Sequence, residues 1–478
     1  MQIYNSLTRK KEELIPNEAG KIRMYTCGPT VYHFAHIGNL RSYIMEDILD
    51  KYLRYAGLEV TRVMNITDVG HLTGDGDDGE DKMLKGAQRE KKTVMQIAEY
   101  YTDAFFTDCK KLNIKRPEYV QPATGCIDDF IKVITSLLEK DYAYIAGGNV
   151  YFDTSKLDQY YVFNDFKEDD LDVGVRDGVE ADQNKRNKAD FVLWFTKSKF
   201  DNQELKWDSP WGVGYPGWHI ECSCISMKFL GEYLDIHCGG IDNMFPHHTN
   251  EIAQSEAYFG HKWCNYWFHA HHLNTNSGKM SKSKGEFLTV SLLESKGYDP
   301  LAYRFFCLQS HYRKSLVFSY ENLDNAALAF NKLIARIAAL KPAEGEAVIE
   351  DDFKALDGQF REALDNDLNT SLAVTALYDV LKANTNAATK LALVAEYDKV
   401  LSLDLIGHAE ALKNTEAEAK TEATADGIPA EEIEALIAER KDAKKAKNFA
   451  RADEIRQYLL DKGVTLIDTR EGTQYKIG

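Results

Sequence analysis

Two adjacent histidines and a nearby glutamate stand in the stretch FPHHTNE, from Phe245 to Glu251. If His247 and Glu251 share a helix, their i, i+4 spacing places both side chains on one face, within reach of a single ion. Two ligands alone do not hold zinc. The stretch is therefore either a solvated helix end or one part of a metal site whose remaining ligands lie elsewhere in the chain.

A second candidate site lies in HFAHIGNL, where His36, Gly38 and Asn39 stand at the expected transition from a strand to a helix. A helix N-terminus offers unpaired N–H groups and the positive end of a dipole, and both favour phosphate. Gly38 has no side chain to keep a nucleotide at a distance, and His36 can donate a hydrogen bond to phosphate oxygens. A plain helix cap would explain these residues equally well, so this motif alone does not identify a nucleotide site.

The stretch KMSKSKGEF, which begins at Lys279, interleaves three lysines with serines before a glycine. It would make a poor core strand and a poor helix, but it suits a mobile loop. Such a loop can close its cations over a polyphosphate leaving group, where negative charge builds up in the transition state. A charge run is more often a solvated loop. The pentad that includes Lys279 and Lys282, together with HIGN upstream, favours ATP chemistry over chance.

An alternation of strands and helices must position these motifs. The runs 22–26 and 59–68 are expected to be buried strands and 36–57 the helix between them. This βαβ order predicts a parallel sheet. Further strands are expected in EYLDIHCGG, NYWFHAHHL and AYRFFCLQS. A helical bundle is expected to follow, to about residue 405. The chain should end with a solvated linker or exposed helix in AEALKNTEAEAKTEATADG and a closing hairpin in VTLIDTREGTQYKI.

The composition, 44% hydrophobic and 28% charged over 478 residues, is that of an ordinary globular protein with two to four domains. No apolar run approaches the ~20 residues that span a bilayer, and the N-terminus lacks a secretory signal, so we expect a cytoplasmic protein without a membrane partner. The eight scattered cysteines predict thiols or metal ligands rather than disulfides. The net charge of −17 argues against indiscriminate nucleic-acid binding, but it allows a locally basic docking surface.

The pair HIGN and KMSKS resembles the two ATP-binding motifs of the class I aminoacyl-tRNA synthetases. Nearly the whole chain is similar to the cysteinyl-tRNA synthetases, through MYTCGPTVYHFAHIGN, NITDVGHL, KRNKADFVLWF, SPWGVGYPGWHIECS, DIHCGGIDNMFPHHTNEIAQSEA and DNDLNTSLA. The resemblance implies an α/β fold: a Rossmann-like parallel-sheet catalytic domain with an inserted connective domain, then a helical bundle and a small C-terminal α+β anticodon-binding domain. We expect the catalytic domain at 1–119 and 206–317, the insertion at 120–205, the bundle at 318–407, a linker at 408–428 and the anticodon-binding domain at 429–478.

The resemblance also implies the remaining metal ligands. That family holds one zinc ion per chain through residues that match Cys27, Cys222, His247 and Glu251. Two thiolates, an imidazole and a carboxylate suit zinc. Cys224 competes with Cys222, because on a strand both would face the metal, whereas on a helix they differ by about 200° and only one can. The match to GWHIEC favours Cys222.

Some neighbouring positions depart from the family pattern. Asn39 stands where many class I enzymes have histidine, Cys238 where glycine is usual, and Thr249 where glutamate is frequent. Asn39 can still donate a hydrogen bond, but it cannot become an imidazolium. His248 is expected to be a hydrogen-bond donor beside the ligands rather than a ligand itself.

The implied substrates are ATP with Mg²⁺, L-cysteine and tRNA(Cys). The cysteine carboxylate would attack the α-phosphate of ATP, and the resulting cysteinyl adenylate would pass its cysteinyl group to the 3′-terminal ribose of the tRNA. Bonding of the substrate thiolate to zinc would exclude serine, which size alone rejects by only about 1–3 kcal/mol. The expected catalytic residues are His36, Asn39, Lys279 and Lys282; the expected ATP contacts are Gly38, Gly240, Asp242 and Lys282; the expected cysteine contacts are Thr67 and Trp218.

The C-terminal region is locally basic. From Arg440 to Arg451, six basic residues stand against one acidic residue. A solvated helix would by itself explain this stretch. The family, however, places its anticodon-binding domain here. In such a domain, basic side chains contact the RNA backbone, and polar side chains form hydrogen bonds with unstacked bases. We therefore expect Arg451, Asp453 and Arg456 to contact tRNA, and we expect a monomer.

Two other functions compete with this interpretation. The cysteine ligase of mycothiol biosynthesis resembles the catalytic half of the family, but it lacks the C-terminal anticodon-binding domain that this sequence retains. A zinc-containing RNA-binding protein without catalysis would not need KMSKS together with all four ligand positions. ATP–pyrophosphate exchange with cysteine separates the non-enzyme from both enzymes, and charging of tRNA separates the two enzymes.

We predict that Lys282→Ala slows the formation of cysteinyl adenylate and leaves the binding of free cysteine nearly intact. A loop lysine acts on charge that develops at the phosphates, and this interaction is stronger in the transition state than in the ground state. Pre-steady-state measurement of the adenylate tests the prediction. An unchanged activation rate would show that the loop is only a solvated run of charge.

Overall fold

The computed structural model describes residues 1–69, 83, 89–90, 92–163, 183–197, 204–275, 278–279, 287–422, 430–446, 448–469 and 472–477. The chain forms two compact units. The first comprises residues 1–333 and 342–404, and the second comprises residues 334–341 and 405–478. Within the described part of the chain, no helix has both the length and the apolar character that crossing a membrane requires.

A five-stranded parallel sheet forms the centre of the first unit. Its strand order is β11 (Cys264–Ala270), β10 (Leu234–Gly240), β3 (Lys21–Thr26), β4 (Glu59–Ile66) and β5 (Tyr119–Pro122). Every neighbouring pair in this sheet is parallel. The predicted Rossmann-like fold class is confirmed. A separate antiparallel pair, β1 (Gln2–Asn5) and β2 (Lys10–Glu13), precedes the sheet in the chain.

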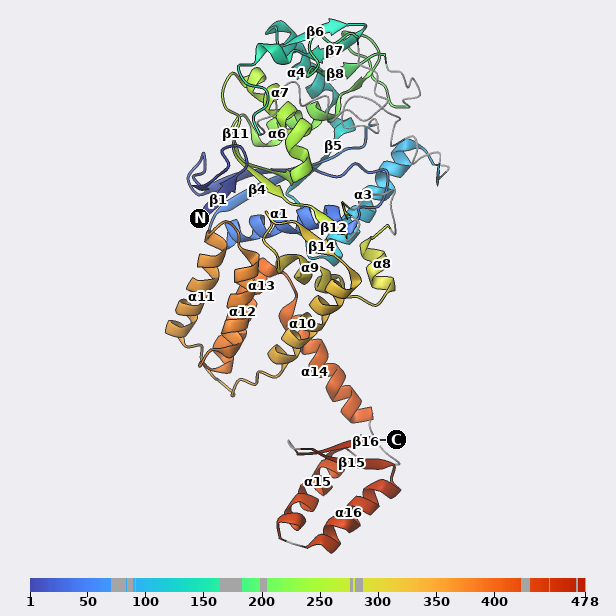
Figure 1. The fold of residues 1–478 in the computed structure, drawn as a ribbon, viewed down its shortest axis with the longest axis vertical. Coiled ribbons are helices and arrows are strands. Elements are labelled where there is room, and N and C mark those ends of the chain that lie inside the picture. The colour runs from blue at the N-terminus through green and yellow to red at the C-terminus, as the bar shows by residue number, and fades with distance from the viewer. Residues whose placement is uncertain are drawn as a thin grey trace. The chain divides into compact units, whose positions relative to one another are not determined.

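Helices cover both faces of this sheet. Figure 1 shows α1 (Ile37–Tyr55) on one face and α6 (Trp218–Leu230) with α7 (Thr249–Phe259) on the other. Helix α3 (Val94–Lys111) begins with a reciprocal capping box between Thr93 and Gln96, which satisfies two backbone N–H groups at its start. Strand β3, helix α1 and strand β4 form the βαβ unit that the sequence predicts.

An antiparallel sheet is inserted between β5 and α6. It contains β6 (Ala143–Ala146), β7 (Asn149–Phe152), β8 (Phe191–Phe195) and β9 (Tyr215–Pro216), and α4 (Ile127–Glu139) precedes it, with one-turn helices η1 (Ala123–Cys126) and η2 (Thr154–Lys156) nearby. Strands β6, β7 and β8 lie within the expected insertion at 120–205, whereas β9 lies beyond residue 205 and β5, which begins at Tyr119, belongs to the parallel sheet. The domain boundaries stay predictions.

The segment after β11 contains one element that the sequence analysis assigned wrongly. AYRFFCLQS was expected to be a strand, but it lies in helix α9 (Pro300–Leu308), which Asp299 caps. Residues 301–308 are all buried, so no polar face marks the helical period in the sequence. The neighbouring elements are β12 (Leu273–Thr275), β13 (Gly278–Lys279), α8 (Val290–Ser295) and β14 (Leu316–Phe318).

The rest of the chain is mainly helical. After α10 (Tyr320–Ala338), helices α11 (Glu350–Asp365), α12 (Thr370–Lys382) and α13 (Ala387–Leu401) pack on one another in the first unit. In the second unit, the stretch that was expected to be a solvated linker or an exposed helix begins within helix α14 (Leu405–Glu422). Helices α15 (Ala430–Lys445) and α16 (Phe449–Asp461) follow it. The predicted closing hairpin is confirmed as β15 (Val464–Thr469) paired with β16 (Gly472–Ile477).

A buried arginine connects several elements of the first unit. Arg304 on α9 is fully buried and donates hydrogen bonds to the carbonyls of Leu401 at 2.7 Å and Leu112 at 2.9 Å. Its guanidinium also lies 2.7 Å from the Asp47 carboxylate on α1. These bonds join α1, α9, the C-cap of α3 and the last residue of α13.

We predict that Arg304→Met lowers the free energy of unfolding of the first unit by about 3–5 kcal/mol, because it leaves buried carbonyls and part of the Asp47 carboxylate without their donor. Urea unfolding followed by tryptophan fluorescence reports on this unit, since all six tryptophans lie in it. The control is Lys382→Met, which removes an exposed ion pair with Asp379 and should cost about 0–1 kcal/mol. Equal losses in the two variants would contradict the prediction.

Candidate functional site

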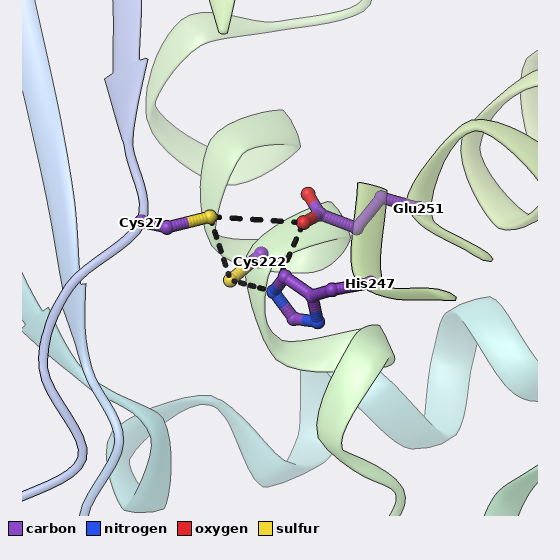
Figure 2. Close-up of side chains that lie close together, drawn as sticks. All are labelled: Cys27, Cys222, His247 and Glu251. Carbon is purple, nitrogen blue, oxygen red and sulfur yellow. Dashed lines mark hydrogen bonds and ion pairs between the residues drawn. The ribbon is translucent and has the colours of Figure 1, made fainter. Parts of the chain in front are cut away.

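Four separate segments bring Cys27, Cys222, His247 and Glu251 together, and Figure 2 shows their side chains converging. Cys27 directly follows β3, and Cys222 lies in the second turn of α6. His247 lies in the helical turn η5 (Met244–His248) after β10, and Glu251 lies in the first turn of α7. Because β3 and β10 are parallel neighbours, their carboxyl ends meet at the same edge of the sheet.

The four side chains form a closed ring of contacts. The Cys27 and Cys222 sulfurs are 3.9 Å apart, and Cys222 Sγ lies 3.4 Å from His247 Nε2. His247 Nε2 lies 3.1 Å from Glu251 Oε1, which is 3.8 Å from Cys27 Sγ. All four ligand atoms therefore lie within 4.8 Å of one another. This arrangement and the N, O and S donor set fit a zinc ion.

Burial disfavours the charged forms of these side chains. Cys222 and Glu251 are at most 1% exposed, and Cys27 is 8% exposed. Burial raises the pKa of the Cys27 thiol well above its usual value, and it also raises the pKa of the Cys222 thiol. Burial raises the pKa of Glu251 to about 8. A cation bound among these groups would favour their deprotonated forms.

A glycine is required at position 28, directly after Cys27. A Cβ added to Gly28 would lie 1.6 Å from the Asn65 carbonyl oxygen, which no side chain could tolerate. The Gly28 N–H also donates to the Asn65 side-chain oxygen at 2.7 Å. This close approach to the end of β4 fixes the backbone directly after Cys27.

Further histidines surround the four ligands. His219 Nδ1 lies 2.8 Å from His247 Nδ1, so the hydrogen bond between them turns His247 Nε2 toward the cluster. His237 Nε2 lies 2.8 Å from Glu251 Oε2. His248 Nε2 lies 3.2 Å from Cys27 Sγ, and its Nδ1 contacts His269 Nε2 at 2.8 Å.

A second possible ligand set was missed by the sequence analysis. Cys27, His237, His248 and Glu251 also have ligand atoms within 4.8 Å of one another. It shares Cys27 and Glu251 with the first set, so the two sets describe one metal position or two adjacent ones. The sequence feature that could have revealed this set was His237 within the expected strand EYLDIHCGG. No single motif, however, links His237 to His248.

The helical geometry separates the two cysteines of ECSC. Helix α6 turns Cys222 toward Cys27, while the Cys224 sulfur lies 4.0 Å from the Asp129 carbonyl on α4. Cys224 is buried and is not part of either candidate ligand set. The preference for Cys222 as a ligand agrees with this placement.

The HIGN motif forms the N-terminus of α1. His36 is its N-cap, and His36 Nδ1 accepts a hydrogen bond from the Asn39 N–H at 3.1 Å. A Cβ on Gly38 would lie 2.9 Å from His36 Nδ1, so glycine protects this cap as well as leaving room for a ligand. The simple cap that the sequence allowed is therefore present, and it does not exclude phosphate binding.

A cavity of about 380 Å³ lies beside the N-terminal end of α1, and Cys27 is among the residues that line it. The predicted site residues that line it are Cys27, His36, Gly38, Asn39, Trp218, Gly240 and Asp242. Trp218 also stacks on His247, with ring centroids 4.3 Å apart. Cys27 and Trp218 thus join the cluster to the cavity.

Other predicted site residues lie apart from this cavity or outside the described structure. Thr67 is 1% exposed, does not line the cavity, and donates its hydroxyl to Glu221 at 2.9 Å. Lys279 ends β13, and only its backbone is described. Lys282 lies outside the described residues.

The predicted tRNA contacts lie on α16 in the second unit. Arg451 is 45% exposed and pairs with Glu439 at 3.0 Å and Glu454 at 2.7 Å. Asp453 and Arg456 are exposed. An RNA phosphate would have to compete with the two carboxylates for the Arg451 guanidinium.

Comparisons with known proteins agree with these observations. Residues 13–328 match the family described as tRNA synthetases class I (C) catalytic domain, and residues 359–426 match the DALR domain. The cysteine–tRNA ligase of Treponema denticola is 45% identical, and the alignment covers 100% of this chain and 99% of that protein. The cysteine–tRNA ligase of Borreliella burgdorferi is 44% identical over 100% of both chains.

A solved structure supports the fold. The methionyl-tRNA synthetase of Mycobacterium tuberculosis in complex with methionyl-adenylate has a TM-score of 0.51 and 15% identity, over 81% of this chain and 90% of that one. At this identity the likeness concerns the fold alone. The full-length relatives and the matched catalytic domain show that the chain belongs to the cysteine–tRNA ligase family of the class I aminoacyl-tRNA synthetases.

Proposed function

We propose that this protein joins cysteine to tRNA(Cys) through a cysteinyl adenylate, and that a zinc ion held by Cys27, Cys222, His247 and Glu251 selects the substrate. The observation that carries this proposal is the position of Cys27, which belongs to the ligand cluster and also lines the cavity at the N-terminus of α1. A cysteine that reached the cluster with its sulfur would have its carboxylate in the same cavity as a nucleotide held at α1.

The ligand cluster accounts for selection between cysteine and serine. Zinc, when bound, supplies a bond to the substrate thiolate that the serine hydroxyl, with its far higher pKa, cannot match. The residues of the chain prepare this position: His219 orients His247, and Trp218 covers the His247 ring and forms a wall of the cavity. Such a site needs no separate editing step.

ATP activation depends on positioning and electrostatics. The N-terminus of α1 offers the positive end of its dipole to the α-phosphate, with His36 at the cap. Gly240 and Asp242 also line the cavity, which supports them as contacts of the nucleoside. Lys279 and Lys282 act on the pyrophosphate leaving group, and Mg²⁺ enters with ATP.

The second unit is the proposed tRNA-reading part. Ile433, Ile455, Leu459, Val464 and Leu466 form a small hydrophobic core of its own, so the segment from α15 to β16 holds together by local packing. Its helix α16 presents Arg451, Asp453 and Arg456, and Phe449 beside them is 62% exposed. Exposed cations and an exposed aromatic ring suit a single-stranded loop.

We predict that the purified protein contains one zinc per chain and catalyses ATP–pyrophosphate exchange with cysteine but not with serine. Cys222→Ser should weaken zinc retention and cysteine activation far more than Cys224→Ser, because only the Cys222 sulfur faces Cys27 and His247. Metal analysis and the exchange assay on the same preparations measure both effects.

The matched cysteine pair also makes this test decisive. Both thiols are buried on one helix, so a general loss of packing would affect both variants. A larger loss in Cys224→Ser would show that the wrong sulfur was chosen. Absence of zinc from protein never exposed to a chelator, or equal exchange with serine, would refute the proposed basis of selection.

We predict that deletion of residues from 425 onward leaves cysteine activation largely intact and cripples the charging of tRNA. The deleted segment carries its own core and none of the residues that line the cavity. Binding of tRNA to the full-length protein should weaken steeply as salt rises, since phosphate contacts release counterions. Equal charging by the two proteins across a range of tRNA concentrations would contradict this assignment.

A further inference from the structure

A second fully buried arginine lies next to the HIGN motif. Arg41, in the second turn of α1, is 0% exposed. Its Nη1 donates to the carbonyls of His271 and, at 2.8 Å, of His272. Its Nη2 donates to the carbonyls of Lys314 at 2.7 Å and His311 at 3.4 Å. One guanidinium thus binds four backbone carbonyls from two separate segments.

These four carbonyls mark the beginnings of two strands. His271 and His272 directly precede β12, while His311 and Lys314 precede β14. The two strands are parallel partners, with Leu273 opposite Leu316. Figure 1 shows β12 and β14 beside α1. Arg41 therefore fixes the start of this strand pair against the helix whose N-terminus carries the HIGN motif.

The same strand pair leads to the first lysine of KMSKS. Strand β12 pairs with β13, and Asn274 lies opposite Lys279. His272 and Leu273 line the cavity, and a Cβ on Gly38 would lie 3.7 Å from the Leu273 Cβ. On the other side of the lysine-rich stretch, the Leu288 carbonyl accepts a hydrogen bond from the Ile37 N–H at 2.9 Å. Both flanks of the stretch are thus fastened to the beginning of α1.

Stability alone is a poor explanation for Arg41. Among the described residues no carboxylate pairs with it, so its charge is balanced only by carbonyl dipoles. Burial of an uncompensated cation costs several kcal/mol, and an apolar side chain of similar size would avoid that cost. The planar fork of arginine can reach carbonyls in two segments at once, whereas the single ammonium of lysine cannot reproduce that geometry.

We propose that Arg41 is a positioning residue for ATP activation, which sets the β12–β13 pair, and with it Lys279, at a fixed distance from the phosphate site at the N-terminus of α1. This inference rests on the proposed function. Arg41 touches neither substrate; it acts through Lys279. Its loss should therefore affect the rate of adenylate formation and not the binding of cysteine, because the proposed metal ligands lie directly after β3 and on α6, η5 and α7.

The test is ATP–pyrophosphate exchange by the full-length, zinc-loaded protein and its Arg41→Lys variant, with Arg304→Lys as the control. Arg304 is also fully buried and donates to backbone carbonyls of the same unit, but those carbonyls belong to Leu401 and Leu112 and not to the residues before β12 and β14. In Arg41→Lys the kcat should fall at least about tenfold, while the KM for cysteine and the zinc content stay within about twofold. In Arg304→Lys the rate per folded molecule should stay within about twofold.

A double-mutant cycle with Lys279→Ala tests whether Arg41 acts through Lys279. If it does, the double variant should be only slightly slower than Lys279→Ala alone. Independent, multiplicative losses would overturn the proposal, as would an unchanged kcat in Arg41→Lys or an equal loss in Arg304→Lys. If the wild-type protein itself fails to exchange pyrophosphate with cysteine, both this inference and the proposed function fall. Wild-type exchange with an unaffected Arg41→Lys variant refutes this inference alone.

Discussion

The site depends on holding two thiols, an imidazole and a carboxylate together where burial opposes charge. Cys27 and Cys222 belong to a hydrophobic core cluster of the first unit, and both are buried. His219 and His237 fix the orientations of His247 and Glu251 through short hydrogen bonds. This arrangement makes chemical sense when a cation occupies it, because the cation would remove the cost of burying several negative groups.

The parallel sheet brings this cluster to the cavity at the N-terminus of α1. Cys27 follows β3 and His247 follows β10, so both lie at the carboxyl edge of adjacent strands. The helix that leaves β3, α1, starts at the same edge and presents His36 to the cavity. Recognition of a sulfur and activation of a carboxylate can therefore take place within one cavity of about 380 Å³.

The chain as a whole is acidic, but basic residues stand at particular places in it. The whole chain carries a net charge of −17, yet α16 presents Arg451 and Arg456 at its surface. Arg451 already pairs with two carboxylates, which would hold its guanidinium in place and limit indiscriminate attraction to nucleic acid. Inside the first unit, Arg41 and Arg304 use backbone carbonyls to connect helices and strands that are distant in sequence.

The sequence by itself determined the βαβ order, the parallel sheet, the closing hairpin and the motifs, because hydrophobic period and turn residues are local signals. The spacing of Cys222 and Cys224 did not separate them, and only the match to GWHIEC favoured Cys222; helix α6 turns the Cys222 sulfur toward Cys27 and the Cys224 sulfur toward α4. It also misassigned α9, whose residues are buried on every side and show no period. Only the tertiary structure revealed His237 beside Glu251 and Arg41 beneath β12, since such contacts join residues that no local pattern relates.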